Sequence, residues 1–225
     1  MKKTLPIIAG VLVLVVLIVG FVIKGKNKAS DTSGEDISNV PTLSESEWPA
    51  ISLTPTNKPG VSGSDGHWLN FKVEKINVRG ASSMDYLLVY NTSDGGQQGV
   101  PGRAELTGDS IEKSLLLGSE SSGKYRYDAG VEQGVMTITF RDKNGKMLGK
   151  LSSDFHLQSG VTELTSIDGI FSYTLDKVAK GVYFITMKTY KEPSATSVVW
   201  QNGYGVFASD GKPYSGKVGG DQSSI

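Results

Sequence analysis

The segment Met136-Thr137-Ile138-Thr139-Phe140 and the turn Asp142-Lys143-Asn144-Gly145 that follows it decide the fold. Apolar and hydroxyl side chains alternate through the first segment, which is typical of a strand with one buried face. The turn ends in glycine, which adopts positive φ readily, so it predicts a hairpin loop. The partner strand returns through Met147, Leu151 and Phe155. These residues therefore predict an antiparallel β-hairpin.

The same alternation, interrupted by glycine-containing turns, extends from residue 67 to residue 215. Further strands are expected at residues 69–73, 76–78, 86–90, 104–106, 111–117, 124–127 and 182–187, and in a hairpin that joins Leu164 to Phe171 through Asp168-Gly169. A change of parity predicts a β-bulge at Glu74-Lys75, and apolar residues on both faces make residues 86–90 a central strand. Residues 198–200 and 204–207 are additional candidate strands, and residues 216–225 are expected to be a disordered tail.

No segment after residue 66 combines a helical period with helix caps. Many short strands with frequent turns predict an all-β fold, an antiparallel β-sandwich. An immunoglobulin-like arrangement is one form of that sandwich, and a small barrel is the alternative.

The N-terminal part carries an apolar segment from Leu5 to Ile23, in which every residue is apolar, glycine or proline. At about 1.5 Å per residue, a helix of this length crosses a hydrocarbon core of ~30 Å. A cleaved secretory signal is the alternative, but the residues after Ile23 lack a small-x-small cleavage site. We therefore expect an uncleaved transmembrane helix (5–23) after a short cytoplasmic tail (1–4).

Lysines flank this segment on both sides, so the positive-inside bias nearly cancels. A short tail before a long C-terminal part favours a single-pass cell-membrane protein whose C-terminal domain lies outside the cytoplasm. The lipid bilayer is then its first partner, contacted from Leu5 to Ile23.

Residues 24–66 are rich in Ser, Thr, Pro, Gly and acidic residues, and we expect them to form a disordered linker. As a flexible coil, the linker would separate its ends by about 35 Å on average. The segment from Trp48 to Leu53 is the exception: it docks on the domain, adds an edge strand to it or stays loose.

Composition excludes several classes of function. Lys plus Arg equals Asp plus Glu at 23 each, so no net positive charge favours nucleic acid. The chain has no cysteine, which excludes disulfides, thiolate metal sites and a cysteine nucleophile. No cofactor and no metal ion are expected.

The candidate catalytic and metal sites have simpler explanations. Ser152, Asp154 and His156 stand about 7 Å apart along a strand, too far for a hydrogen-bonded triad, and His156 is expected to face solvent. The oxygen-rich turn at residues 142–145 lacks the ligand spacing and the closing glutamate of a calcium site. The oxygen donors at residues 91–96 are residues that any long loop uses. Asn91-Thr92-Ser93 also matches a glycosylation sequon. No catalytic, cofactor-binding or metal-binding residue is assigned.

One group of aromatic residues is suited either to a carbohydrate or peptide surface or to the core of the sandwich. Its members are Tyr125, Tyr127, Tyr183, Trp200 and Tyr204.

Several short strings resemble uncharacterised single-span, membrane-anchored β-sandwich surface proteins of ultrasmall candidate-phylum bacteria. They are Tyr86-Leu87-Leu88-Val89-Tyr90-Asn91, Gly99-Val100-Pro101-Gly102, Leu115-Leu116-Leu117-Gly118-Ser119, Ser122-Gly123-Lys124-Tyr125-Arg126-Tyr127 and Asp154-Phe155-His156-Leu157. The resemblance covers residues 68–160 and the anchor layout, and it implies a bacterial envelope location without a biochemical activity. Relatives carry a cysteine pair where this chain has Glu120 and Tyr125, so no disulfide is implied here.

The resulting expectation is a membrane-anchored, extracytoplasmic binding or adhesion module that is not an enzyme, with an unidentified protein or glycan ligand. A structural envelope component, pilin-like or an assembly subunit, is the alternative. A surface hydrolase is the third, and it requires a pocket with a carboxylate or histidine of shifted pKa.

Overall fold

The computed structural model describes residues 40–194 and 198–219. The expected cytoplasmic tail, transmembrane helix and first part of the linker lie outside the described residues. Within them, no helix is long and apolar enough to cross a membrane. The β domain is formed by the unit that begins at Thr42.

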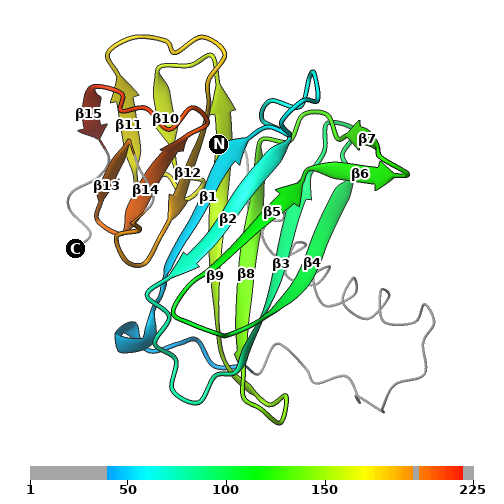
Figure 1. Cartoon of the computed structure of the whole chain (residues 1–225). Coiled ribbons are helices and arrows are strands. Elements are labelled where there is room, and N and C mark those ends of the chain that lie inside the picture. The colour runs from blue at the N-terminus through cyan, green and yellow to red at the C-terminus, as the bar shows by residue number, and fades with distance from the viewer. Residues whose placement is uncertain (1–39, 195–197, 220–225) are drawn as a thin grey trace, which may run out of the picture. The chain divides into compact units, whose positions relative to one another are not determined.

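A seven-stranded antiparallel sheet is the centre of the domain (Figure 1). Its strands, in spatial order, are β13 (Val199–Gln201), β14 (Tyr204–Ala208), β12 (Tyr183–Lys188), β9 (Met147–Ser159), β8 (Gln133–Arg141), β3 (Ser83–Asn91) and β4 (Gln97–Glu105). The predicted hairpin of β8 and β9 is confirmed, and β3 lies between two other strands, as its apolar sequence predicted.

Two three-stranded sheets and one separate hairpin complete the domain. The sheets are β1 (Ala50–Thr56), β2 (Trp68–Glu74) and β5 (Ile111–Leu116), and β10 (Glu163–Thr165), β11 (Ser172–Leu175) and β15 (Gly216–Gly219). The hairpin consists of β6 (Gly118–Ser121) and β7 (Lys124–Tyr127). The only helix among the described residues is a 3₁₀ turn at Glu45–Glu47. The all-β, antiparallel prediction is confirmed.

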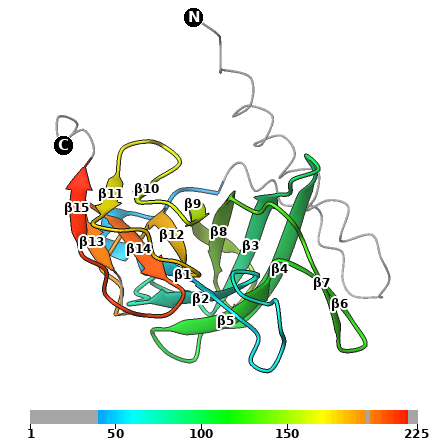
Figure 2. The ribbon, with the colours of Figure 1, turned by 90° about the horizontal axis from the view of Figure 1, so that it is seen from above.

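Successive residues of β12 enter two different hydrophobic cores, because neighbouring side chains of a strand point to opposite faces. Ile185 and Met187 join the core that the central sheet shares with β1, β2 and β5. Phe184 instead packs with Leu164 and Tyr173 of the other small sheet. Figures 1 and 2 show these layers, with β1, β2 and β5 over one face of the central sheet and β10, β11 and β15 beside β12 and β14.

The predicted domain start at residue 67 was too late. Strand β1 pairs with β2 along its whole length, and its Ile51 and Leu53 are fully buried. The period-two pattern of apolar Ile51, Leu53 and Pro55 lies within a polar stretch, so composition concealed a core strand. The linker prediction therefore fails for residues 50–56, and of the alternatives for the segment from Trp48 to Leu53 the edge strand is the one present.

Three other details differ from the predictions. Strand β2 ends at Glu74, and Lys75, with φ of 58°, turns the chain, so the parity change marks a strand end and not a bulge. Gly216–Gly219, expected in a disordered tail, forms β15 against β11. The division into sheets of seven and three strands also differs from the immunoglobulin arrangement of about four and three.

Candidate ligand-binding groove

One end of the domain carries an open hollow of about 420 Å³. It lies between the loop that enters β2, the segment that enters β8, the end of β9 and the start of β12. Both histidines of the chain, His67 and His156, line it, together with the carboxylates Asp65 and Glu132 and the ring of Tyr183. Segments far apart in the sequence therefore meet at this end.

A second hollow of about 290 Å³ adjoins the first, because Gly130 and Glu132 line both. Its other walls are polar and come from Asn91, Thr92, Ser93 and Gln133. We call the two hollows together the end groove.

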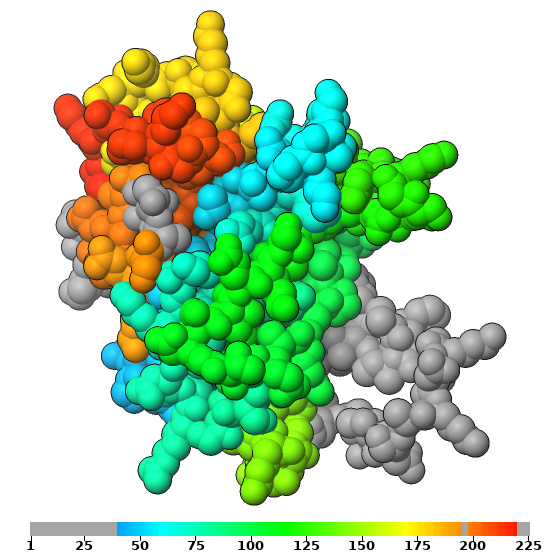
Figure 3. Space-filling model, in the orientation of Figure 1, coloured from blue at the N-terminus to red at the C-terminus, as the bar shows by residue number. Residues whose placement is uncertain are grey.

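Four aromatic side chains form a row beside the end groove. The rings of His67 and Tyr127 stack with centroids 4.6 Å apart, and Tyr127 lies nearly parallel to Tyr125 at 6.4 Å. Trp68 meets Tyr125 edge-on at 5.6 Å, and the Lys58 ammonium lies 5.1 Å from the Trp68 ring centre. In Figure 3, the cyan loop after β1 and the green hairpin of β6 and β7 project from the same end of the domain. We call His67, Tyr127, Tyr125 and Trp68 the aromatic row.

Glycine at position 66 is required by this packing. Gly66 has φ of +75°, and a Cβ atom there would lie 2.6 Å from the ring of Tyr183. The ring thus lies directly against the backbone of the loop that presents Asp65 and His67, which fixes one wall of the groove.

The ring of His67 is electrically neutral near pH 7. Burial lowers its pKa below the ordinary value, because the nearby carboxylates of Asp128 and Asp65 offset only part of the cost of desolvating a charged ring. A shifted histidine in a pocket is one feature that the hydrolase alternative requires. A nucleophile must also lie within hydrogen-bond reach, and within the described residues neither ring nitrogen of His67 has a hydrogen-bond partner.

His156 is held in one tautomer by the neighbouring layer. Its Nδ1 lies 2.9 Å from the carbonyl oxygen of Thr165 and 3.1 Å from the hydroxyl oxygen of the same residue. Because a carbonyl oxygen only accepts hydrogen bonds, the shorter contact requires the proton on Nδ1. In the neutral ring, Nε2 is then an acceptor, and it has no protein partner among the described residues. The prediction that His156 faces solvent is met only in part, because the side chain is half-buried, with Nδ1 against Thr165 of β10 while the ring lines the open hollow.

Gln158 fastens β9 to β10 beside His156. Its amide nitrogen donates to the carbonyl of Glu163, and its amide oxygen accepts from the backbone N–H of Thr165. Although Gln158 lines the groove, both ends of its side chain already have partners, so its role there is structural.

Ser152, Asp154 and His156 do not form a triad. The Ser152 hydroxyl lies 2.9 Å from the hydroxyl of Thr137, and His156 Nδ1 is bonded to Thr165, so the three side chains are not linked to one another. This arrangement agrees with the spacing argument from the sequence.

The two oxygen-rich loops are turns stabilised by their own aspartates. Asp142 Oδ1 accepts from the backbone N–H groups of Asn144 and Lys146, and Asp94 Oδ1 accepts from the backbone N–H of Gly96. Among the described residues, no group of His, Asp and Glu side chains is arranged to hold a metal ion.

The structure separates the five aromatic residues singled out in the sequence. Tyr125, Tyr127 and Tyr183 lie at or beside the end groove. Tyr204 belongs to the second core and donates to Asp168, whereas the Trp200 indole donates to Thr189. No sequence pattern indicates Asp65 and Glu132, because only the fold brings them to one hollow.

Comparison of the sequence with known protein families and with curated proteins finds no match.

Proposed function

We propose that this chain is a membrane-anchored binding or adhesion module that displays its β domain outside the cytoplasm. The domain takes a ligand at the end groove and catalyses no reaction. The groove carries this proposal, because it joins two hollows and gathers side chains from five separate segments at one end of the domain. Pockets with a few convergent polar groups are the usual place for a ligand.

The sequence supports the membrane part of the proposal. The uncharged segment from Leu5 to Ile23 is long enough to span a bilayer, and it is followed by a polar stretch that would hold the β domain away from the membrane surface. Treatment of intact cells with protease tests the orientation. The β domain is expected to be digested, and full protection in intact cells with digestion only after lysis would refute display outside the cytoplasm.

Adhesion of proteoliposomes tests the binding part. Liposomes that carry the full chain are expected to be retained on bacterial cell surfaces or on a glycan-coated surface above empty liposomes. Glu132→Lys places a cation in the groove and is expected to abolish the retention. Glu105→Lys, an equal charge reversal on the exposed β4 strand, is the control and is expected to preserve it. Equal retention by both variants, or none above empty liposomes, would contradict the proposal.

A structural envelope component is the second candidate, and the edge strand β4 favours it. No strand in the described part of the chain pairs with the outer side of this nine-residue strand. An open edge invites pairing with another chain, but Pro101 within β4 has no N–H to donate and limits it. Regular oligomers or filaments of the full chain in sedimentation and electron microscopy would favour this candidate over the binding module.

A further inference from the structure

We infer that the end groove binds an uncharged oligosaccharide, an inference that rests on the proposed function. Its hydroxyl groups bond to the acidic and amide side chains of the groove, and the faces of its sugar rings pack on the aromatic row.

The charge of the groove excludes an anionic ligand. Neither hollow is lined by a lysine or an arginine, whereas Asp65 lines the first hollow and Glu132 lines both. His67 adds no positive charge near neutral pH, because its pKa is lowered. Inside the two hollows, a phosphate, a sulfated glycan or a nucleic acid would meet carboxylates without a cation among the lining residues, which is unfavourable. The Lys58 ammonium lies outside the hollows, over the rings of Trp68 and Tyr125.

The polarity of the groove favours a ligand that is rich in hydroxyl groups. The carboxylates of Glu132 and Asp65 accept hydrogen bonds, and Asn91 and Gln133 offer amide groups. His156 lines the groove with a ring that is held in place through Nδ1. A lipid tail or a large apolar side chain would leave these groups without partners, which is unfavourable.

The aromatic row supplies flat apolar surfaces at the same place. The rings of Tyr125 and Tyr127 are half-exposed and lie within 5° of parallel, so the row is built before any ligand arrives. A sugar ring has one apolar C–H face that packs on such a ring, while its hydroxyl groups point outward. Tyrosine suits this use because it combines a large apolar body with a polar tip.

Two buried polar atoms in the row lack partners. Trp68 Nε1 and Tyr127 Oη are both buried without a hydrogen bond among the described residues, and the Trp68 residue is only 9% exposed. Such orphaned atoms are uncommon in a native domain and call for an explanation. Both atoms are closed to solvent as the row stands, so a ligand hydroxyl supplies the missing partner only where the rings part to admit it.

Titration calorimetry of the full chain tests the inference. The chain should be kept in a polyoxyethylene detergent, because detergents with sugar headgroups would compete. The probes are cellotetraose, maltotetraose and chitotetraose, with inorganic phosphate, a heparin hexasaccharide and a tryptic peptide pool from serum albumin as the comparison. Saturable binding of at least one neutral tetrasaccharide is expected, without binding of phosphate or heparin.

Matched variants locate the binding and separate its parts. Glu132→Gln and Tyr127→Ala are expected to lower the affinity at least tenfold, whereas Tyr127→Phe, which keeps the ring, is expected to lower it less. Glu105→Gln and Tyr214→Phe, which lie outside the groove, serve as controls and are expected to leave the affinity unchanged. Equal binding of a tetrasaccharide by the groove variants and the controls would overturn the inference.

Failure of the inference can be told apart from failure of the proposed function. Binding of phosphate, heparin or a peptide that is lost in Glu132→Gln would overturn the oligosaccharide ligand and leave the binding module intact. No binding of any probe, together with no retention of the proteoliposomes, would overturn both.

Discussion

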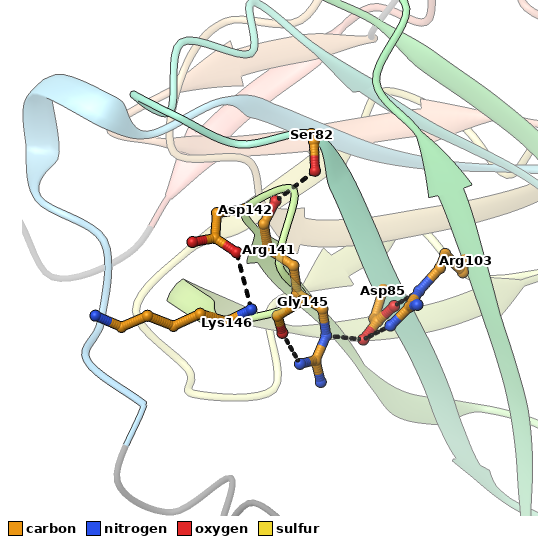
Figure 4. A network of polar contacts seen from close by, with 7 residues as sticks. All are labelled: Ser82, Asp85, Arg103, Arg141, Asp142, Gly145 and Lys146. Carbon is orange, nitrogen blue, oxygen red and sulfur yellow. Dashed lines mark hydrogen bonds and ion pairs between the residues drawn. The ribbon is translucent and has the colours of Figure 1, made fainter. Parts of the chain in front are cut away.

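Asp85 joins three neighbouring strands of the central sheet through charged hydrogen bonds (Figure 4). Its Oδ2 accepts from Arg141 Nε at 2.6 Å, and both carboxylate oxygens accept from the guanidinium of Arg103. Arg141 also donates to the carbonyl of Gly145, so the cluster ties the turn between β8 and β9 to the sheet. Burial disfavours the charged carboxylate, but the bonds from Arg103 and Arg141 outweigh it and lower the pKa of Asp85.

We expect Asp85→Asn to lower the free energy of unfolding by about 1–2 kcal/mol at pH 7. This value is low for hydrogen bonds to a charged group, because Arg103 is largely exposed and solvent weakens its interaction with Asp85. A carboxyl whose pKa is lowered by folding stabilises the protein above its unfolded pKa of about 3.9 and loses this effect as the pH falls through the folded value. The difference between wild type and variant in urea denaturation should therefore shrink below pH 4. A difference that stays constant from pH 7 to pH 2 would contradict this account.

Two glycines with the same backbone conformation separate strain from packing. Gly60 and Gly66 have φ of +77° and +75°, but only at Gly66 would a Cβ atom meet another residue, the ring of Tyr183. Gly60→Ala should lower the free energy of unfolding by about 1 kcal/mol through backbone strain alone. Gly66→Ala should lower it by about 1–3 kcal/mol more, because the Tyr183 ring must move. Denaturant midpoints measure the stability of both variants. An equal loss of stability in the two would show that the Tyr183 ring moves aside without cost.

At the scale of elements, the hairpin of β6 and β7 pairs only with itself among the described strands. A two-stranded hairpin is marginally stable alone. Its contacts with the rest of the domain include two aromatic pairs, His67 with Tyr127 and Trp68 with Tyr125. The aromatic row therefore lies beside the groove, which only its His67 lines, and holds the hairpin in place.

Removal of one ring is expected to loosen this hairpin. In Tyr127→Ala, limited trypsin digestion of the full chain should cleave after Lys124 and Arg126, both exposed, several-fold faster than in wild type. Cleavage after Lys143 in the turn between β8 and β9 is the internal control and should not change. Mass spectrometry of the fragments reports both rates, and an equal increase at both turns would indicate global destabilisation instead.

The elements that the sequence predicted are those whose signal is local. The turn at Asp142 to Gly145 and the turn at Asp168-Gly169 each join alternating segments, and both hairpins are present. The order of strands in the central sheet and the groove were not predictable, because they depend on contacts between distant segments. His67 and Tyr127 stack although sixty positions separate them in the chain, and no spacing of residues reports such a contact.

For the molecule as a whole, the important revision concerns where the β domain begins. The compact unit starts at Thr42, and Trp48, expected to be loose or docked, donates from its indole to the carbonyl of Leu43. Ile51 also donates from its backbone to the carbonyl of Thr189. The described residues from Thr42 onward thus belong to the folded domain, and the proposed tether is limited to the residues before Thr42.

Two truncations test this boundary. A chain of residues 42–225 should unfold with the same urea midpoint as the full chain, because it retains β1. A chain of residues 67–225 loses Ile51 and Leu53 from the core and leaves one edge of β2 unpaired. Each buried aliphatic side chain contributes about 1.5–3 kcal/mol, against a total of roughly 5–15 kcal/mol for a domain, so this chain should lack a cooperative transition.

Leu53→Ala in the full chain is the milder control, with an expected loss of about 2–5 kcal/mol. Circular dichroism during urea denaturation measures all three, and a cooperative transition of residues 67–225 at the midpoint of the longer chain would show that β1 is dispensable.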